Sequence, residues 1–409
     1  MRLSYLIMFL VLIILASCTN ENITPPISKR LVIVYMIADN NLDYFAVSNI
    51  NDMERGYNSD FNGDLLVYID RGSNTKPSHP YLMQIMHDTT ELVNSKIIRT
   101  YPEQNSADAK SLKQVIEDAI SYGQYSSIGL VLWSHGSAWL PSGSSLYSDR
   151  SITLVNEKRI NRPQRSFGSD DVIENSKDST CDMDIKDLAS ALSGYKFDFL
   201  IFDACYMGTI EVAYELRNSN KYFIASPAEI LSSGFPYKQI VPMFFAKNVN
   251  PSAIAKQYSD YYLSQKGALC SGTISVVNSK NLESFANAIK LLNDNLYARG
   301  LNVNIILQNK DSLQQYDRLK AGILFDYKQF LIKEANLCSA RMPDVMDSWN
   351  STITSEYHTK LIFNSLSLDN CNGISVYLPN SKYSKLNEYY KTLSWYKDSG
   401  YDKILPISN

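Results

Sequence analysis

Short apolar runs that stop abruptly at polar residues constrain the fold of this chain more than any other feature. The clearest run covers residues 197–202, stops at Asp203 and Cys205, and is followed directly by a helical pattern that extends to Leu216. This pattern predicts a buried strand, a sharp turn and a helix, with Cys205 at the turn. Because ligands bind beyond the carboxyl ends of the strands in an open parallel sheet, we expect a substrate to reach Cys205.

The surroundings expected for Cys205 favour a reactive sulfur. Near the first turn of the following helix, unpaired N–H groups and the positive end of the helix dipole would stabilise a thiolate. Side chains alternate along a strand, so Asp203 and Cys205 should project to the same side if the strand extends that far. The sequence therefore predicts a thiol with a carboxylate as its neighbour.

A second apolar run, residues 127–134, leads straight into His135 and Gly136. The chain contains four histidines, and His135 is the only one that ends a predicted strand. A thiol has a free pKa of about 8.5, so a nucleophilic cysteine needs a base or a cationic partner. Each residue alone is more often structural than catalytic, but both are expected on the same rim of one sheet. We therefore predict a catalytic pair of His135 and Cys205.

Four motifs along the chain resemble one known family. They read Y-M-I-A-D-N-N-L, V-L-W-S-H-G, F-D-A-C-Y-M-G and A-S-P-A-E-I, in that order. With these motifs the chain, from about Leu31 to the C-terminus, resembles the clostripain family (C11-type) of cysteine peptidases, which belongs to the caspase-like clan. The resemblance implies a caspase-like α/β/α sandwich with a central, mostly parallel sheet. It also implies a Cys/His dyad and cleavage after Arg or Lys, and the Q-A-C motif of caspases is absent.

The resemblance also assigns roles to single residues. His135 matches the catalytic histidine, Cys205 the nucleophile, and Asp203 an acid that receives the basic P1 side chain. Another strand is expected to end at Ser226 and Glu229 on the same rim, so we predict that both line this P1 pocket. The alternatives are a structural role for Asp203, and a turn cap or an ion pair with a surface lysine for Glu229.

The mechanism expected from these residues is acyl transfer through a thioester. The Cys205 thiolate attacks the carbonyl carbon, and His135 supports the thiolate and then protonates the leaving amine. The backbone N–H groups of Gly136 and Cys205 are the candidate oxyanion donors. No third residue that would orient His135 is evident from the sequence.

The segment between the two predicted catalytic strands, residues 137–182, is the least regular part of the chain. Loops of this length inside a compact domain are usually functional or disordered. The family resemblance implies an activating cleavage after a basic residue in this segment, and our candidates are Arg150, Lys158 and Arg159. An uncut insertion is the alternative.

The N-terminus carries the features of a bacterial lipoprotein signal. Residues 1–17 hold one basic residue and an apolar core that is shorter than the roughly 20 residues a membrane span requires. The following L-A-S-C resembles a lipobox, so we predict a lipidated Cys18, a tether over residues 18–29 and a peptidase domain over residues 30–400. An ordinary signal peptide is the alternative. The expected location is the outer membrane or the cell surface.

Composition restricts the partners of the chain. The formal charge is −3, with a pI near 5.9 and no basic cluster, which argues against nucleic acid. We expect a monomer that binds peptide substrates and contacts the membrane only through its lipid. No cofactor or metal site is predicted, and calcium enters only through the family resemblance. Buried free thiols are favoured over disulfides for the remaining cysteines, whose spacing fits no zinc motif: Cys181, Cys270, Cys338 and Cys371.

Alternating strand and helix patterns predict an α/β fold. Further strands are expected at residues 31–37, 65–69, 81–86, 96–99, 222–225, 272–277 and 373–379. Helices are expected at residues 42–55, 108–122, 184–192, 251–265 and 281–298, and another opens near Phe325. The C-terminal part, from about residue 280 to 409, is a helical and β extension that forms either its own subdomain or an addition to the central sheet.

Two other functions remain compatible with the same residues. One is a lipid-anchored binding protein that keeps the fold and uses the groove for recognition only. The other is a thiol amidase or transpeptidase that transfers the acyl group to an amine.

Overall fold

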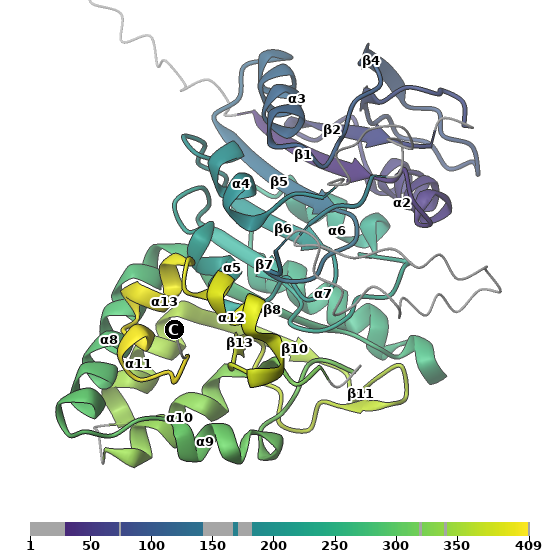
Figure 1. Cartoon of the computed structure of the whole chain (residues 1–409). Coiled ribbons are helices and arrows are strands. Elements are labelled where there is room, and N and C mark those ends of the chain that lie inside the picture. The colour runs from purple at the N-terminus through teal and green to yellow at the C-terminus, as the bar shows by residue number, and fades with distance from the viewer. Residues whose placement is uncertain are drawn as a thin grey trace, which may run out of the picture.

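A nine-stranded sheet forms the centre of the computed structural model, and helices cover both of its faces (Figure 1). The structure describes residues 29–72, 75–141, 167–170, 182–318, 321–338 and 342–407. Across the sheet the strands follow the order β10-β8-β7-β6-β5-β1-β2-β3-β4. Their bounds are β1 (Arg30–Ile37), β2 (Gly63–Asp70), β3 (Tyr81–Gln84), β4 (Lys96–Thr100), β5 (Ser127–Trp133), β6 (Phe199–Asp203), β7 (Tyr222–Ala225), β8 (Thr273–Asn278) and β10 (Ile353–His358).

The five central strands, from β2 to β7 in the order of the sheet, run parallel to one another. Strands β3 and β4 at one edge and β8 and β10 at the other are antiparallel. The predicted α/β/α sandwich is therefore confirmed, with its parallel strands at the centre. The strands predicted at residues 81–86 and 96–99 are observed as β3 and β4, an antiparallel pair at one edge of the sheet.

The sheet buries both faces, which explains the continuous apolar runs in its central strands. In β1, residues 31, 33, 35 and 37 join one hydrophobic core, and residues 32, 34 and 36 join the other. Helices α3 (Ala109–Ser121), α4 (Ile185–Ala191) and α5 (Ile210–Glu215) cover the first face. Helices α2 (Asp43–Gly56), α6 (Tyr237–Phe244) and α7 (Pro251–Leu263) cover the second.

Local sequence explains where several helices begin. Asp108 accepts a hydrogen bond from the Lys110 N–H at the start of α3, and Asn250 accepts one from Ala253 at the start of α7. These side chains satisfy N–H groups that the first helical turn leaves unpaired. The apolar side chains of α3 are buried, namely Leu112, Val115, Ile116 and Ala119.

The C-terminal part extends the sheet and also packs beside it, at the lower left of Figure 1. Strand β10 adds to the edge of the sheet beside β8, whereas the hydrophobic core under α5 continues into the C-terminal helices. These helices are α8 (Leu282–Ala298), α9 (Asn304–Gln308), α10 (Tyr327–Leu337), α11 (Met342–Thr352), α12 (Ser384–Tyr390) and α13 (Ser394–Asp398). Two small antiparallel pairs accompany them, namely β9 (Leu324–Asp326) with β13 (Ser375–Tyr377) and β11 (Leu361–Ile362) with β12 (Leu366–Ser367).

Several elements of this part differ from the sequence predictions, since helices α9, α11, α12 and α13 and strands β11 and β12 were not predicted. Strand β10 was not predicted, and residues 324–326 form β9 before α10 begins. Asp326 ends β9 and caps α10 by accepting a hydrogen bond from the Gln329 N–H, so the helix starts at Tyr327.

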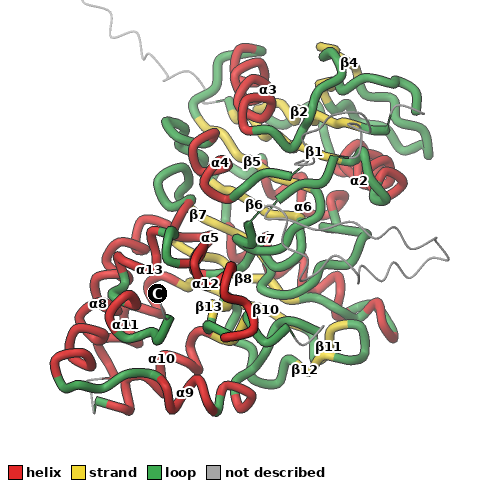
Figure 2. The backbone as a smooth tube through the Cα atoms, in the orientation of Figure 1, coloured by secondary structure: helices red, strands yellow, loops and turns green. Residues whose placement is uncertain are grey.

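The order of the strands points to the place where a ligand would bind. After β1 the chain forms β2 and the edge strands, and it then returns to build β5 on the other side of β1. In open α/β sheets ligands bind beyond the carboxyl ends of the strands at such a reversal. Loops follow β1, β5 and β6 at these ends (Figure 2).

Candidate active site

The register of β5 and β6 brings the two predicted catalytic segments side by side. Trp133 pairs with Asp203, and both strands end at this pair, so His135 and Cys205 each follow their strand at the same offset. The segments also touch, because a Cβ atom at Gly136 would lie 2.6 Å from the carbonyl oxygen of Cys205. The candidate pair therefore lies at one rim of the sheet, as predicted from the sequence.

The segment between β6 and α5, which holds Cys205, contains more residues than predicted and includes a sharp turn. Tyr206 has a left-handed φ of 63°, and its N–H donates to the Ala228 carbonyl oxygen at 2.9 Å. The Gly208 N–H donates to the Ser226 carbonyl oxygen at 2.7 Å. Because these residues bond to the segment after β7, α5 begins only at Ile210. The expectation that Cys205 lies near the first turn of that helix is therefore wrong.

The Cys205 thiol is free and partly exposed. The Ile230 N–H donates to its Sγ atom at 3.3 Å. Desolvation raises the pKa of this thiol to about 12, and the nearby negative charge of Glu229 acts in the same direction. At neutral pH the sulfur is therefore a thiol, and it needs a base to become a nucleophile.

His135 has a partner that the sequence did not reveal. Its Nε2 atom lies 2.7 Å from Oδ1 of Asn41, which follows β1 at the rim of the sheet. Because an amide oxygen can only accept, Nε2 carries the proton and Nδ1 keeps a lone pair. Desolvation lowers the pKa of His135 to about 4, so the ring is neutral at neutral pH. A neutral imidazole is the form that accepts a proton from a thiol.

Asp203 is buried, with 4% of its surface exposed. Its Oδ2 atom accepts hydrogen bonds from the Phe235 N–H at 3.0 Å and from the Tyr237 hydroxyl at 2.9 Å. Desolvation raises the pKa of this carboxyl to about 7, against the effect of both donors. Gly234, which has a φ of 66°, lies directly over the carboxylate, where a Cβ atom would come within 2.5 Å of Oδ2. The acid is therefore covered by the segment that leads into α6.

Ser226 and Glu229 are already engaged with other groups. The Ser226 hydroxyl is buried and bonds to Ala228, accepting from its N–H at 3.2 Å and donating to its carbonyl oxygen at 3.0 Å. Glu229 binds the Arg318 guanidinium with both oxygens, at 2.7 and 2.9 Å. The guanidinium also stacks 4.8 Å from the ring centroid of Phe363. Lining of a P1 pocket by Ser226 and Glu229 stays a prediction, and Arg318 is a neighbour that sequence reasoning missed.

Comparison with known proteins agrees with this arrangement. The model of the clostripain family, peptidase family C11, matches residues 34–406. The chain belongs to the clostripain family. The resemblance noted from the four motifs is therefore confirmed, together with the family's character as cysteine peptidases.

Relatives of known sequence and structure support this membership. Clostripain from Hathewaya histolytica is 26% identical over 234 residues, which is 52% of this chain and 41% of that protein. A secreted C11 cysteine protease from Bacteroides thetaiotaomicron, solved with an irreversible peptide inhibitor, is 29% identical with a TM-score of 0.72, covering 92% of this chain and all of that one. An inactive zymogen of a C11 protease from Parabacteroides distasonis is 31% identical with a TM-score of 0.70, covering 92% of this chain and 99% of that one.

Several predicted residues of this clostripain family member lie outside the described residues. They are the lipidation candidate Cys18, the cleavage candidates Arg150, Lys158 and Arg159, and Cys181. Within the described ranges Cys270, Cys338 and Cys371 are free, and the latter two are buried, so the preference for free thiols is confirmed for these three residues. None of the described helices is long and apolar enough to cross a membrane.

Proposed function

We propose that this clostripain family member is an endopeptidase that cleaves after Arg or Lys with a dyad of Cys205 and His135. The observation that carries the proposal is the register of β5 and β6, which end together two residues before His135 and Cys205. The electrostatics support it further. A neutral thiol becomes a nucleophile by transferring one proton to a neutral imidazole, and the hydrogen bond to Asn41 places the ring proton on Nε2, which makes Nδ1 the nitrogen that accepts.

In the first half of the reaction Sγ of Cys205 attacks the carbonyl carbon of the substrate while His135 takes the thiol proton. The carbonyl electron pair moves to oxygen, where the N–H groups of Gly136 and Cys205 donate hydrogen bonds. Such donors are typically worth about 10² to 10³ in rate. The tetrahedral species collapses, the amine leaves with the proton held by His135, and a thioester remains on Cys205.

Water completes the reaction. His135 removes a proton from the water as its oxygen attacks the thioester carbon. The carbon–sulfur bond then breaks, the acid product leaves, and the proton returns to Sγ. The same histidine therefore serves as base and acid in both halves, a contribution that is typically about 10² to 10⁴ in rate.

Recognition of the P1 side chain rests on Asp203. Both described donors to this carboxylate reach Oδ2, so we assign Oδ1 to the incoming guanidinium or ammonium group. A charge-assisted hydrogen bond in a buried site is stronger than a neutral one, and Arg adds bidentate geometry. The substrate must displace or reshape the segment around Gly234 to reach this oxygen.

Self-activation and export belong to the same proposal. Cleavage after Arg150, Lys158 or Arg159 would cut the chain between His135 and Cys205, and the relative from Parabacteroides distasonis is described as an inactive zymogen. The relative from Bacteroides thetaiotaomicron is described as secreted, which supports export of this chain. Anchoring through a lipid on Cys18 rests on the lipobox-like sequence alone.

The proposal is tested by hydrolysis of matched fluorogenic peptides with Arg, Lys, Asp or Ala at P1. We expect the full chain to cleave the Arg and Lys peptides and the Cys205→Ala form to cleave none. Asp203→Asn should lower kcat/KM for the basic peptides by about 10-fold to 100-fold, the value of a hydrogen bond to a charged group. Analysis of the Cys205→Ala form on a gel shows whether it stays uncut.

Other outcomes would favour the alternatives. Equal cleavage of the Asp and Arg peptides would contradict the assignment of Asp203. Absence of any cleavage by the full chain would favour a binding protein on the same fold. Transfer of the acyl group to an added amine, in place of release by water, would identify a transpeptidase.

A further inference from the structure

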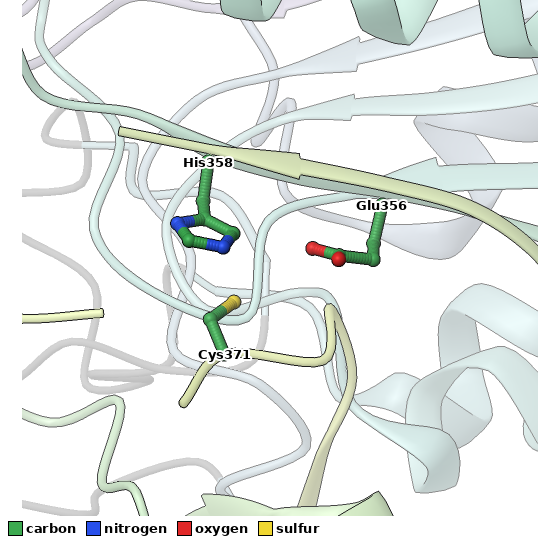
Figure 3. Close-up of side chains that lie close together, drawn as sticks. All are labelled: Glu356, His358 and Cys371. Carbon is green, nitrogen blue, oxygen red and sulfur yellow. The ribbon is translucent and has the colours of Figure 1, made fainter. Parts of the chain in front are cut away.

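Three residues that the proposed peptidase mechanism does not use lie together at the outer edge of the sheet. Glu356, His358 and Cys371 each bring one ligand atom within 4.8 Å of the others. Figure 3 shows the three side chains pointing toward one another, with Glu356 and His358 on β10 and Cys371 on the loop that precedes β13. We propose that these residues bind a divalent cation of the zinc class.

The donor set selects this class of cation. Sulfur, imidazole nitrogen and carboxylate oxygen are the three ligand types that Zn²⁺ accepts in proteins. Calcium and magnesium take oxygen ligands and would leave Cys371 and His358 unused. Around a tetrahedral zinc ion, bonds of about 2.0 to 2.3 Å separate the ligand atoms by roughly 3.5 Å. The ligand atoms lie within 4.8 Å of one another, and Glu356 is exposed, so its carboxylate has room to turn toward the other two ligands.

His358 is held in the tautomer that a metal requires. Its Nδ1 atom lies 2.9 Å from the carbonyl oxygen of Thr359. Because a carbonyl oxygen can only accept, Nδ1 carries the hydrogen and Nε2 keeps its lone pair. Histidine ligands in metal sites commonly donate their second N–H to a backbone carbonyl, which fixes the orientation of the ring.

Cys371 supplies a sulfur atom that is already surrounded by hydroxyl groups. Its Sγ atom lies 3.2 Å from the Tyr316 hydroxyl and 3.6 Å from the Thr273 hydroxyl. The side chain is 7% exposed, so its position is set by packing. When the cation binds, a sulfur–metal bond forms and the thiol proton passes to solvent, as metal binding to cysteine requires. With Glu356 and His358 as the other ligands, water fills the fourth position.

The site joins elements that are far apart in the sequence. Glu356 and His358 come from the edge strand, whereas Cys371 belongs to a small core with Ala228, Tyr316 and two other apolar residues. The carbonyl of Ala228 accepts the hydrogen bond from Tyr206 that shapes the turn at Cys205. A bound cation would therefore stabilise the packing behind the candidate active site, without a part in its chemistry. The Glu356 carboxylate also faces Lys328, with which a cation must compete.

The test is a titration of the reduced, chelator-treated full chain with Co²⁺ alone, in the Cys205→Ala form so that the candidate nucleophile cannot bind. We expect one equivalent of Co²⁺ to produce a thiolate-to-cobalt charge-transfer absorption that Zn²⁺ displaces. The absorption should disappear in Cys371→Ser. His358→Gln and Glu356→Gln should each weaken binding by more than about 10-fold, the smallest loss expected even for a residue that only supports a ligand.

Matched controls separate this site from other thiols and histidines. Cys270→Ser removes a partly exposed thiol elsewhere, and His79→Gln removes a half-exposed histidine that faces Glu103. Both should leave the titration unchanged. Absence of the absorption, or its persistence in Cys371→Ser, would overturn the proposal. If the buried serine variant does not fold, unchanged Co²⁺ affinity in both His358→Gln and Glu356→Gln would overturn it equally.

Discussion

At the scale of single residues, the neighbours of the dyad decide its protonation. Asn41 accepts a hydrogen bond from Nε2 of His135, and burial keeps that ring neutral. Burial likewise keeps Cys205 protonated and raises the pKa of Asp203 to about 7. The dyad is therefore uncharged at neutral pH before substrate binds, whereas Asp203 is only partly ionised and would ionise further beside a basic side chain.

Asn41 is expected to act as a positioning residue for His135. In Asn41→Ala the ring loses the partner that selects its tautomer, so kcat should fall by about 10-fold to 100-fold, part of the contribution of acid–base catalysis. KM should change little, because Asn41 does not contact the P1 acid. Steady-state kinetics on an Arg peptide measures both values.

A second variant at this position separates orientation from folding. Asn41→Asp keeps an acceptor and adds a negative charge, so it should restore part of kcat and shift the acidic limb of the pH profile to higher pH. A merely structural role would predict no such shift, and it would also predict that kcat and thermal stability fall together in Asn41→Ala.

The pKa of Asp203 predicts a pH dependence of substrate recognition. Below a pH of about 7 the carboxyl is protonated and loses its attraction for a cation, and above it the carboxylate is present. The value of kcat/KM for an Arg peptide should therefore rise as the pH increases through about 7. Measurement of the pH profile checks this, because kcat/KM reports the groups of the free enzyme.

A peptide with citrulline at P1 is the matched control, since citrulline has nearly the shape of Arg without its charge. Its kcat/KM should be low and should lack the rise near pH 7. If both peptides share the same profile, the titration belongs to another group and the role of Asp203 is contradicted.

At the scale of the elements, the contact between β5 and β6 holds the site together. Gly129 in β5 lies beneath the ring of Phe199 in β6, in the space where any other residue would place its Cβ atom. Phe199 in turn stacks on Phe244 of α6, with ring centroids 5.2 Å apart. The packing where these two strands begin to pair therefore requires a residue without a Cβ atom beside the aromatic ring.

Gly129→Ala is expected to destabilise the protein by about 1 to 3 kcal/mol, the usual cost of adding a methyl group to a filled core. Denaturant unfolding measures this difference. The double variant Gly129→Ala, Phe199→Leu should lose less stability than the sum of the two single variants, because the smaller side chain makes room for the methyl group. Strict additivity would show that the two positions are not coupled.

At the scale of the whole molecule, the sequence predicted the central strands and the rim well, because buried parallel strands have a continuous apolar pattern that ends in polar residues. The same pattern predicted that His135 and Cys205 lie at one rim of the sheet, after neighbouring strands. The sequence did not predict which residues from distant parts of the chain contact the site. The contact of Asn41 with His135 arises because β5 lies beside β1 in the sheet. Arg318 binds Glu229 across a sequence separation of 89 residues.

Two further differences at this scale have local physical causes. The start of α5 was predicted too early, since Tyr206 and Gly208 bond to the segment after β7 before a helix can form. Strand β10 was missed because its six residues, I-T-S-E-Y-H, lie on the edge of the sheet and are only partly buried, so they lack the apolar run of a central strand.

The central claim, that His135 activates Cys205 for attack on peptides with a basic P1 residue, is tested most directly by covalent labelling. The full chain would be treated with a peptidyl chloromethyl ketone that carries Arg at P1, and the modified residue identified by mass spectrometry. The account predicts one adduct, on Cys205, that forms much more slowly in His135→Ala and with an Asp-bearing reagent. An adduct on Cys270, or equal labelling of Cys205 with and without His135, would contradict it.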